Sequence, residues 1–277
     1  MYATLLDLID KKYFKVIASK EDDTILRLVN ADTTNLKKFE KLLLDFVSKF
    51  EINGDISLNS IADNGDPHEF KDFKNSWIEE TSKEVPDSLI DRYFISKGST
   101  IFKIVAFGLL IISVIVFFVI ISFEVNKYYW ILLVLSLLMF VESIIMFSIP
   151  NYVPGRWTPE GKEFHDKWEN FKNYITDFSL IKEKPPASIQ VWGRYLVYAA
   201  ALGCADEVSE NMKKYFDIAG VSDDYINRSD AVMFGYYGGF TNLNNTFTAL
   251  TPSSDSSSGG IGSVGGGGFG GGGGGTF

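Results

Sequence analysis

The sequence predicts an α-helical membrane protein in which a two-helix transmembrane hairpin joins two cytoplasmic parts. Residues 101–123 and 128–150 are long runs that are apolar on every side, and only four residues separate them. The flanking segments show the periodic apolar patterns of helices and strands. We expect a partial winged-helix-like α+β domain at 1–100, an outside loop at 124–127, a small helical domain at 151–220 and a disordered Gly-rich tail at 221–277.

The first residues predict a helix followed by a β-hairpin. Residues 2–12 place Leu5, Leu8 and Ile9 on one face, and two alternating runs follow at 13–19 and 23–30. A helix and a hairpin form the second half of a winged helix, but the two helices that would close its core do not precede them. We therefore expect that the chain starts inside a domain, as a fragment or truncated reading frame would.

Charge argues against a nucleic-acid partner for this domain. Residues 1–100 carry 14 Lys and Arg against 19 Asp and Glu, residues 151–277 carry 10 against 14, and the net charge is −9. The predicted recognition helix contains Asp7 and Asp10, and acidic residues occupy the predicted wing tip. Phosphates would be repelled there, so a module that contacts protein is the favoured interpretation.

Two further helices are expected before the hairpin. Residues 35–50 carry Leu and Phe at helical spacing, and residues 66–83 carry Phe70, Phe73 and Trp77 after a turn and short segment at 53–61. Val85–Pro86 then breaks the pattern. The aromatic positions are typical of a core.

The two apolar runs have the length that a membrane requires. A helix rises about 1.5 Å per residue, so some 20 residues cross about 30 Å of hydrocarbon. Tyr128, Tyr129 and Trp130 open the second run and are expected to anchor it at the membrane interface, and Pro150 ends it. The alternative is a pair of buried core helices of a soluble protein, which rarely stay apolar all round for so long.

Basic residues predict the orientation. Several precede the first span and follow the second, including the expected interface anchors Lys103 and Arg156, whereas the connecting loop has Lys127 alone. We therefore expect the chain to cross the cell membrane twice. By the positive-inside rule both termini are expected in the cytoplasm.

Glu142 is the one acidic residue inside the spans. Counting back from Pro150 places it about 12 Å into the helix. An ionised carboxylate there costs a few kcal/mol, so it should be protonated, paired or turned toward a polar partner. Ser113, Ser136 and Ser143 are candidate partners, and Lys103 is within reach of the same region. A proton or ion relay, or a contact to a further membrane helix, is the functional hypothesis, and a polar contact that stabilises the hairpin is the favoured structural alternative.

The segment after the hairpin predicts three short helices. Thr158 is expected to cap the first, with Pro159 at its first position and Glu160 favoured by the helix dipole. Ser188 can cap a second helix that Gly203 ends, and a third is expected at 205–216. Three helices of this size can share a small core.

Three motifs in this segment carry a family resemblance. They are RWTPEGKE at 156–163, KWENFKNYITDFS at 167–179 and VWGRYLVYAAALG at 191–203. With the preceding hairpin and the Gly-rich tail, the chain resembles the carboxy-terminal portion of the YciQ-like predicted bacterial membrane proteins, a family of unknown function. The resemblance implies an upstream signal sequence, an extracytoplasmic β-rich domain and another transmembrane helix. It implies no catalytic residues.

The tail is expected to be flexible from residue 221. Residues 259–277 contain 13 Gly, and such a composition cannot bury enough surface to offset its ordering entropy. The glycines match a nucleotide-binding pattern only trivially, because no predicted strand precedes them.

No constellation of catalytic or metal-binding residues stands out. Cys204 is the single cysteine, and a pairing with His165 as a nucleophile depends on the fold. We expect no enzyme activity, no cofactor and no metal site. The leading hypothesis is a non-enzymatic membrane-anchored interaction or scaffolding protein that contacts the lipid bilayer and either another membrane helix or a cytoplasmic protein. The alternatives are a transport or proton-linked component that uses Glu142, and a membrane-tethered transcription regulator.

Overall fold

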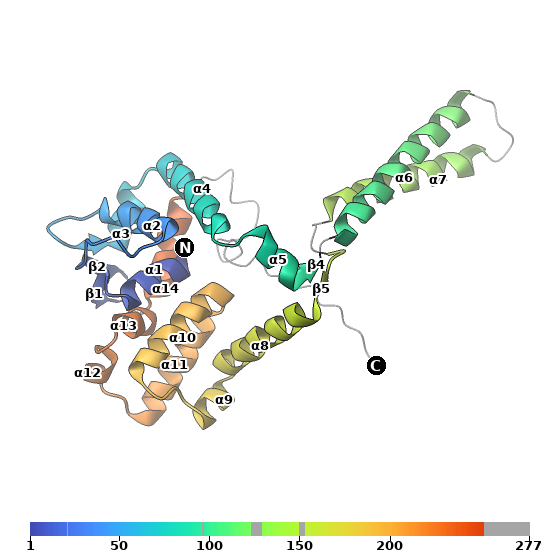
Figure 1. Ribbon diagram of the computed structural model, residues 1–277. Coiled ribbons are helices and arrows are strands. Elements are labelled where there is room, and N and C mark those ends of the chain that lie inside the picture. The colour runs from blue at the N-terminus through green and yellow to red at the C-terminus, as the bar shows by residue number, and fades with distance from the viewer. Residues whose placement is uncertain (21, 96, 123–128, 150–152, 252–277) are drawn as a thin grey trace. The chain divides into compact units, whose positions relative to one another are not determined.

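The computed structural model describes residues 1–251 except 21, 96, 123–128 and 150–152. The described residues form two units (Figure 1). Residues 1–85 and 167–251 make up the first, which we call the body. Pro86–Asp166 makes up the second, which we call the hairpin unit.

The first half of the body contains the predicted helix and β-hairpin. Its elements are α1 (Tyr2–Asp10), β1 (Phe14–Ser19), β2 (Thr24–Leu28), α2 (Lys38–Ser48), β3 (Ile56–Ser57), α3 (Leu58–Asn64) and α4 (Pro67–Lys83). The strands form an antiparallel sheet in the order β1-β2-β3, with Phe14 opposite Leu28. The sequence predicted α1, β1, β2, α2 and α4, but not that the segment at 53–61 contains β3 and the start of α3.

The second half of the body is entirely helical. Its elements are the end of α8 (Pro159–Thr176), then α9 (Phe178–Glu183), α10 (Ile189–Leu202), α11 (Ala205–Ala219), α12 (Asp223–Ile226), α13 (Asp230–Tyr236) and α14 (Gly239–Ala249). The predicted boundaries of α10 are confirmed: the Ser188 hydroxyl accepts from the Val191 N–H at 3.4 Å, and Gly203 ends the helix with φ of 72°. A positive φ is accessible to Gly without strain.

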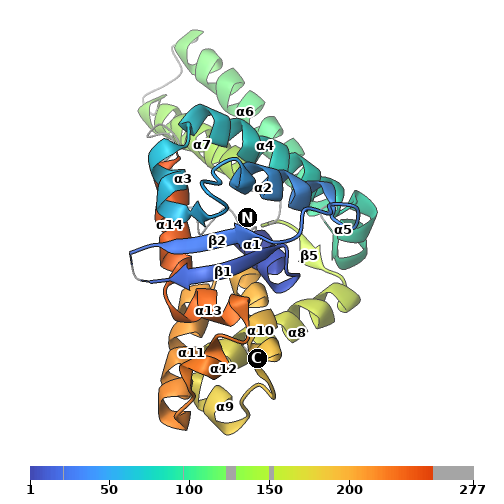
Figure 2. The same ribbon diagram turned by 90° about the vertical axis from the view of Figure 1, so that its left-hand side faces the viewer.

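One continuous cluster of buried side chains joins the two halves of the body. Helix α1 packs against α10 and α13, and α14 packs against α3, as Figure 2 shows. Leu5, Leu8 and Ile9 on α1 are fully buried. Trp192 on α10 and Phe247 on α14 are at most 2% exposed. The structure therefore differs from the prediction of separate cytoplasmic domains at 1–100 and 151–220.

Hydrogen bonds tie α13 and α14 to the sheet side of the body. The Asn242 amide donates to the Lys20 carbonyl at 2.8 Å and to the Thr24 hydroxyl at 3.0 Å. The Thr246 hydroxyl donates to the Leu58 carbonyl at 3.0 Å, and Asp230 accepts from the backbone N–H of Val16 at 3.2 Å. Buried polar groups need such partners, so these bonds fix where the helices lie.

The prediction of a flexible tail is therefore wrong for the residues of α12, α13 and α14. Their apolar side chains are buried, and their buried Asn and Thr side chains are hydrogen-bonded within the body. The Gly-rich part of the predicted tail, residues 252–277, lies outside the described residues.

Helices from the far end of the chain also take part in the core around α1. Helices α10 and α13 both pack against α1. The expectation that the chain starts inside a domain stays a prediction. The winged-helix likeness itself stays a prediction.

The hairpin unit consists of two long helices and a short base. Its elements are α5 (Asp87–Tyr93), β4 (Phe94–Ile95), α6 (Lys97–Ser122), α7 (Tyr129–Ser148), β5 (Arg156–Trp157) and the start of α8. Within α6 and α7, Gly98–Ile120 and Trp130–Ser148 are long and apolar enough to cross a membrane. The predicted helices are thus present, while the predicted loop at 124–127 lies outside the described residues.

We predict that Phe247→Ala lowers the free energy of unfolding of the body by about 3–5 kcal/mol, because it opens a cavity in the shared core. The exposed neighbour Asn245 on the same helix provides the control. Asn245→Ala should change the free energy of unfolding by less than about 0.5 kcal/mol. Urea denaturation of the full chain in detergent, followed by Trp fluorescence, measures both. Equal small effects would show that α14 is not part of the core.

Candidate functional site

Small side chains line the contact between α6 and α7. The buried positions include Ala106 and Ser113 on α6 and Ser136 and Ser143 on α7, each at most 2% exposed and each pair seven residues apart. The Ser143 hydroxyl donates to the Ala106 carbonyl across the contact at 3.0 Å. Small residues let helix backbones approach closely, and a seven-residue spacing keeps them on the facing sides of two helices.

The hydroxyl groups of the other two serines form hydrogen bonds within their own helices. Ser113 donates to the Leu110 carbonyl at 2.8 Å, and Ser136 donates to the Leu133 carbonyl at 2.9 Å. All three serines predicted as partners of Glu142 therefore serve the packing of the hairpin. The prediction that they meet Glu142 is not supported.

Glu142 lies on the outer surface of the hairpin. It is exposed, although the next residue, Ser143, is fully buried, because adjacent helical residues point about 100° apart. No hydrogen bond or ion pair joins Glu142 to any residue that the structure describes, Lys103 included. The Glu142 carboxyl group thus faces outward, and no described residue of the hairpin forms a hydrogen bond or ion pair with it.

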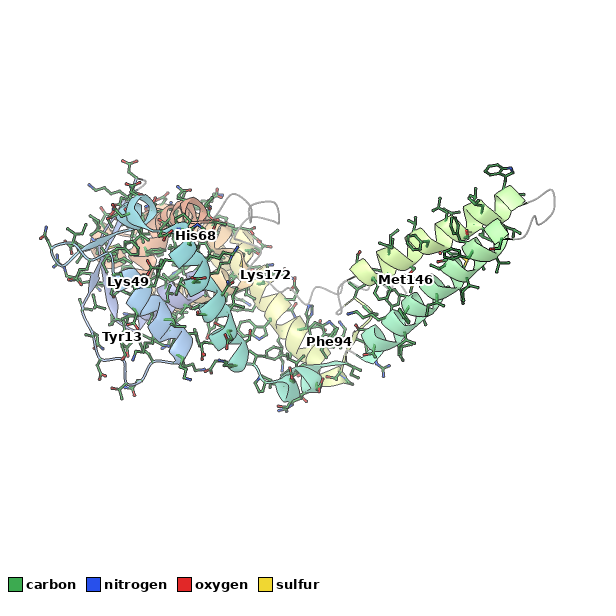
Figure 3. All side chains as sticks on the ribbon, turned by 90° about the horizontal axis from the view of Figure 1, so that it is seen from above. Tyr13, Lys49, His68, Phe94, Met146 and Lys172 are labelled. Carbon is green, nitrogen blue, oxygen red and sulfur yellow. The ribbon has the colours of Figure 1, made fainter. Side chains whose placement is uncertain are left out.

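Most of the rest of the outer surface is apolar, as the side chains in Figure 3 around Met146 illustrate. Phe107, Phe118, Leu135 and Ile145 are each more than half exposed. Only 17% and 11% of the most apolar stretches of α6 and α7 are buried. Core helices of a soluble protein would be mostly buried, so this exposure argues against that alternative.

The structure describes the side chains of three of the predicted interface anchors, and they lie near the ends of helices. Trp130 is exposed in the first turn of α7, Lys103 is partly buried near the start of α6, and Arg156 is exposed in β5. Tyr128 and the side chain of Tyr129 lie outside the described residues. The anchoring role of these side chains stays a prediction.

The ends of the hairpin are held together by the base of the unit. Strands β4 and β5 pair antiparallel, with Phe94 opposite Trp157 and their rings edge-to-face at 5.2 Å. Thr158 caps α8 as predicted: its hydroxyl oxygen accepts from the Gly161 N–H at 2.9 Å and its hydroxyl donates to the Arg92 carbonyl at 2.8 Å. One threonine therefore joins the chain before the hairpin to the chain after it.

An ion pair and a close backbone approach complete this base. The Arg92 guanidinium donates to both carboxylate oxygens of Glu160, at 3.0 and 2.5 Å. Gly161 lies so close to Tyr93 that a Cβ atom on residue 161 would sit 1.8 Å from the Tyr93 carbonyl oxygen. The RWTPEG part of the first motif thus has a structural role, which is to hold the two ends of the hairpin.

Three observations bear on the candidate metal-binding and nucleophilic residues. No group of three or more His, Cys, Asp or Glu within them is arranged to hold a metal ion. Burial raises the pKa of the Cys204 thiol, and a raised pKa is the opposite of what activates a cysteine nucleophile. His165 lies in the hairpin unit, where its ring contacts Trp157 at 4.9 Å and its Nδ1 lies 3.4 Å from Asp166.

The body contains one small hollow between α1, α4 and α10. Its volume is about 200 Å³, and its lining is mainly apolar, with Tyr2, Trp77, Ile78 and Ala200 among the residues around it. Pockets for small ligands commonly span about 300–1,000 Å³. Burial, followed by the charge of Asp206, raises the pKa of Tyr2 to about 12, so this phenol stays neutral.

Fold and site together define a mainly helical protein with a small sheet and two apolar helices, α6 and α7, that could span a membrane. Residues 1–212 match the sequence model of the C-terminal domain of a family of predicted membrane proteins, described as "Predicted membrane protein (DUF2207) C-terminal domain". The chain belongs to this family, whose function is unknown. The match confirms the resemblance drawn from the three motifs. No curated protein and no solved structure matches the sequence.

We predict that cysteines at positions 106 and 143 form a disulfide in a Cys204→Ala background, because the Ser143 hydroxyl reaches the Ala106 backbone. Ile104→Cys with Ser143→Cys is the matched control, since Ile104 is 66% exposed on another face of α6. Mild oxidation in membranes and counting of free thiols by mass spectrometry distinguish the two. Equal cross-linking of both pairs would contradict this helix packing.

We predict that Gly161→Ala destabilises the base of the hairpin by about 1–3 kcal/mol or more, because the added methyl group overlaps the Tyr93 carbonyl. Gly108→Ala is the control, since a Cβ atom there meets nothing within 4 Å. Hydrogen exchange of residues 92–95 and 156–164 measures the change. Unaltered protection in Gly161→Ala would show that the close approach is not required.

Proposed function

We propose that the protein is a non-enzymatic, membrane-anchored interaction protein. The hairpin spans the cell membrane twice, and the body lies in the cytoplasm. The outer face of α7 binds a helix of another membrane protein through Glu142. The observation that carries the proposal is the outward position of this carboxyl group on an otherwise apolar surface, with no partner among the described residues.

The energetics of a carboxyl group in hydrocarbon support a protein partner. An acidic side chain near the middle of a membrane helix costs about 2.5–3.5 kcal/mol on insertion scales. Glu142 is six residues from the end of α7 at Ser148, or about 9 Å along the helix, which is too deep for a short side chain to reach water easily. A donor on a neighbouring helix would offset this cost, and the serines of the hairpin do not supply it.

The shared core supports the proposed topology. The body combines residues from before α6 with residues from after α7 in one cluster of buried side chains. Segments that pack into one core must lie on one side of the membrane. The basic residues that flank the spans favour the cytoplasmic side.

The properties of the body favour interaction over catalysis. Its only cysteine is buried with a raised pKa, and its small hollow is lined mainly by apolar side chains. Its surface is acidic on balance, which disfavours nucleic acid as a partner. A binding role needs none of the groups that a catalytic site requires.

We predict that Glu142→Leu abolishes recovery of a membrane partner by cross-linking in intact cells, whereas Glu142→Gln, which keeps a hydrogen-bonding side chain, retains part of it. Val141→Leu is the control, because Val141 is also exposed on α7 but apolar. Cross-linked complexes are counted by quantitative mass spectrometry. The proposal fails if Glu142→Leu recovers the same partners as the parent chain. Proton flux through the purified chain that Glu142→Gln abolishes would favour a transport role instead.

A further inference from the structure

A groove lies at the base of the spans, where α6 begins and α7 ends. Six residues line it: Ser99, Thr100, Lys103, Ile104, Phe107 and Phe147. Its volume is about 430 Å³. Ser99, Thr100 and Lys103 provide two hydroxyls and an ammonium group, and the other three side chains are apolar. The groove is therefore polar toward the start of α6 and apolar deeper along the helix.

Lys103 is the cation of this groove. It lies six residues after the start of α6 at Lys97, or about 9 Å along the helix, and it is partly buried. No ion pair joins it to a carboxylate in the described part of the chain, and Glu142 is not among the residues that line the groove. An ammonium group at this depth reaches toward the membrane surface along its own methylene groups.

The geometry points to a binding site for one anionic phospholipid. We propose that its phosphate lies against the Lys103 ammonium and the Thr100 hydroxyl, while an acyl chain lies along Ile104, Phe107 and Phe147. This inference rests on the membrane anchoring proposed above, which places the groove at the cytoplasmic surface. Basic pockets between membrane helices on this side are typical sites for acidic lipid headgroups.

The apolar half of the groove selects a lipid over free phosphate. Phe107 is 57% exposed and Ile104 is 66% exposed, so the groove offers apolar surface that an acyl chain can cover. Each buried methylene group contributes about 0.8 kcal/mol. Inorganic phosphate would use only the polar half, where a single ammonium group supplies the charge.

Native mass spectrometry of the full chain tests the proposal. The protein is reconstituted in bilayers of phosphatidylglycerol and phosphatidylcholine with identical acyl chains, and the lipids that stay bound after extraction are counted. We expect one phosphatidylglycerol per chain, retained about fivefold over phosphatidylcholine. This preference corresponds to the attraction that one Lys near a membrane surface exerts on an anionic lipid. Lys103→Gln should remove this preference and leave phosphatidylcholine retention unchanged.

Two variants keep the test specific. Thr100→Val should lower the preference about twofold or more, because it removes a hydroxyl and leaves the charge. Lys162→Gln is the matched control: Lys162 is 66% exposed, pairs with Asp166 on α8 and does not line the groove. It should retain the full preference.

Three outcomes would overturn the site. They are an unchanged preference in Lys103→Gln, an equal loss in Lys162→Gln, and full displacement of the lipid by millimolar inorganic phosphate. A chain that does not enter bilayers at all would refute the anchoring itself. A chain that enters them without preferring phosphatidylglycerol refutes only the groove.

Discussion

The structure depends on the burial of α1 between the sheet that follows it in sequence and helices from the far end of the chain. Helices α10 and α13 cover α1, and α14 covers α3. The hydrogen bonds of Asn242 and Thr246 to the sheet side fix this arrangement. These segments come from both sides of the hairpin in sequence, so the core joins the chain before α6 to the chain after α7. If the hairpin spans a membrane as proposed, both segments must therefore lie on the same side of it.

The hairpin separates its packing residues from its outward-facing charge. Ala106, Ser113, Ser136 and Ser143 face inward, where small size matters and their hydroxyls bond to backbone carbonyls. Glu142 faces outward, one residue before Ser143, whose hydroxyl bonds across the contact between the helices. The helix pair is therefore complete without Glu142, so any role of this residue involves a group outside the described hairpin. No ion pair joins Lys103 to a carboxylate of the described residues, and Lys103 lines the groove together with Thr100.

Local signals predicted the local structure well. Apolar runs predicted α6 and α7, and capping residues predicted the start of α8 and both ends of α10. Long-range partners could not be predicted in this way. The sequence of α14 is rich in Asn and Thr, which are weak helix formers and suggest a solvated segment. Only the fold reveals that Asn242 and Thr246 are buried hydrogen-bonding groups. The serines suggested as partners of Glu142 bond to backbone carbonyls instead, because composition does not determine which face of an apolar helix meets its neighbour.

Native-state hydrogen exchange of the full chain in a lipid bilayer tests the shared core most directly. If residues 1–85 and 167–250 form one cooperative unit, the slowest amides of α1 and β1 exchange with the same opening free energy as those of α10 and α14. That free energy then falls in parallel for all four elements as urea is added. Separate opening of α10 and α14, with α1 and β1 still protected, would contradict the account.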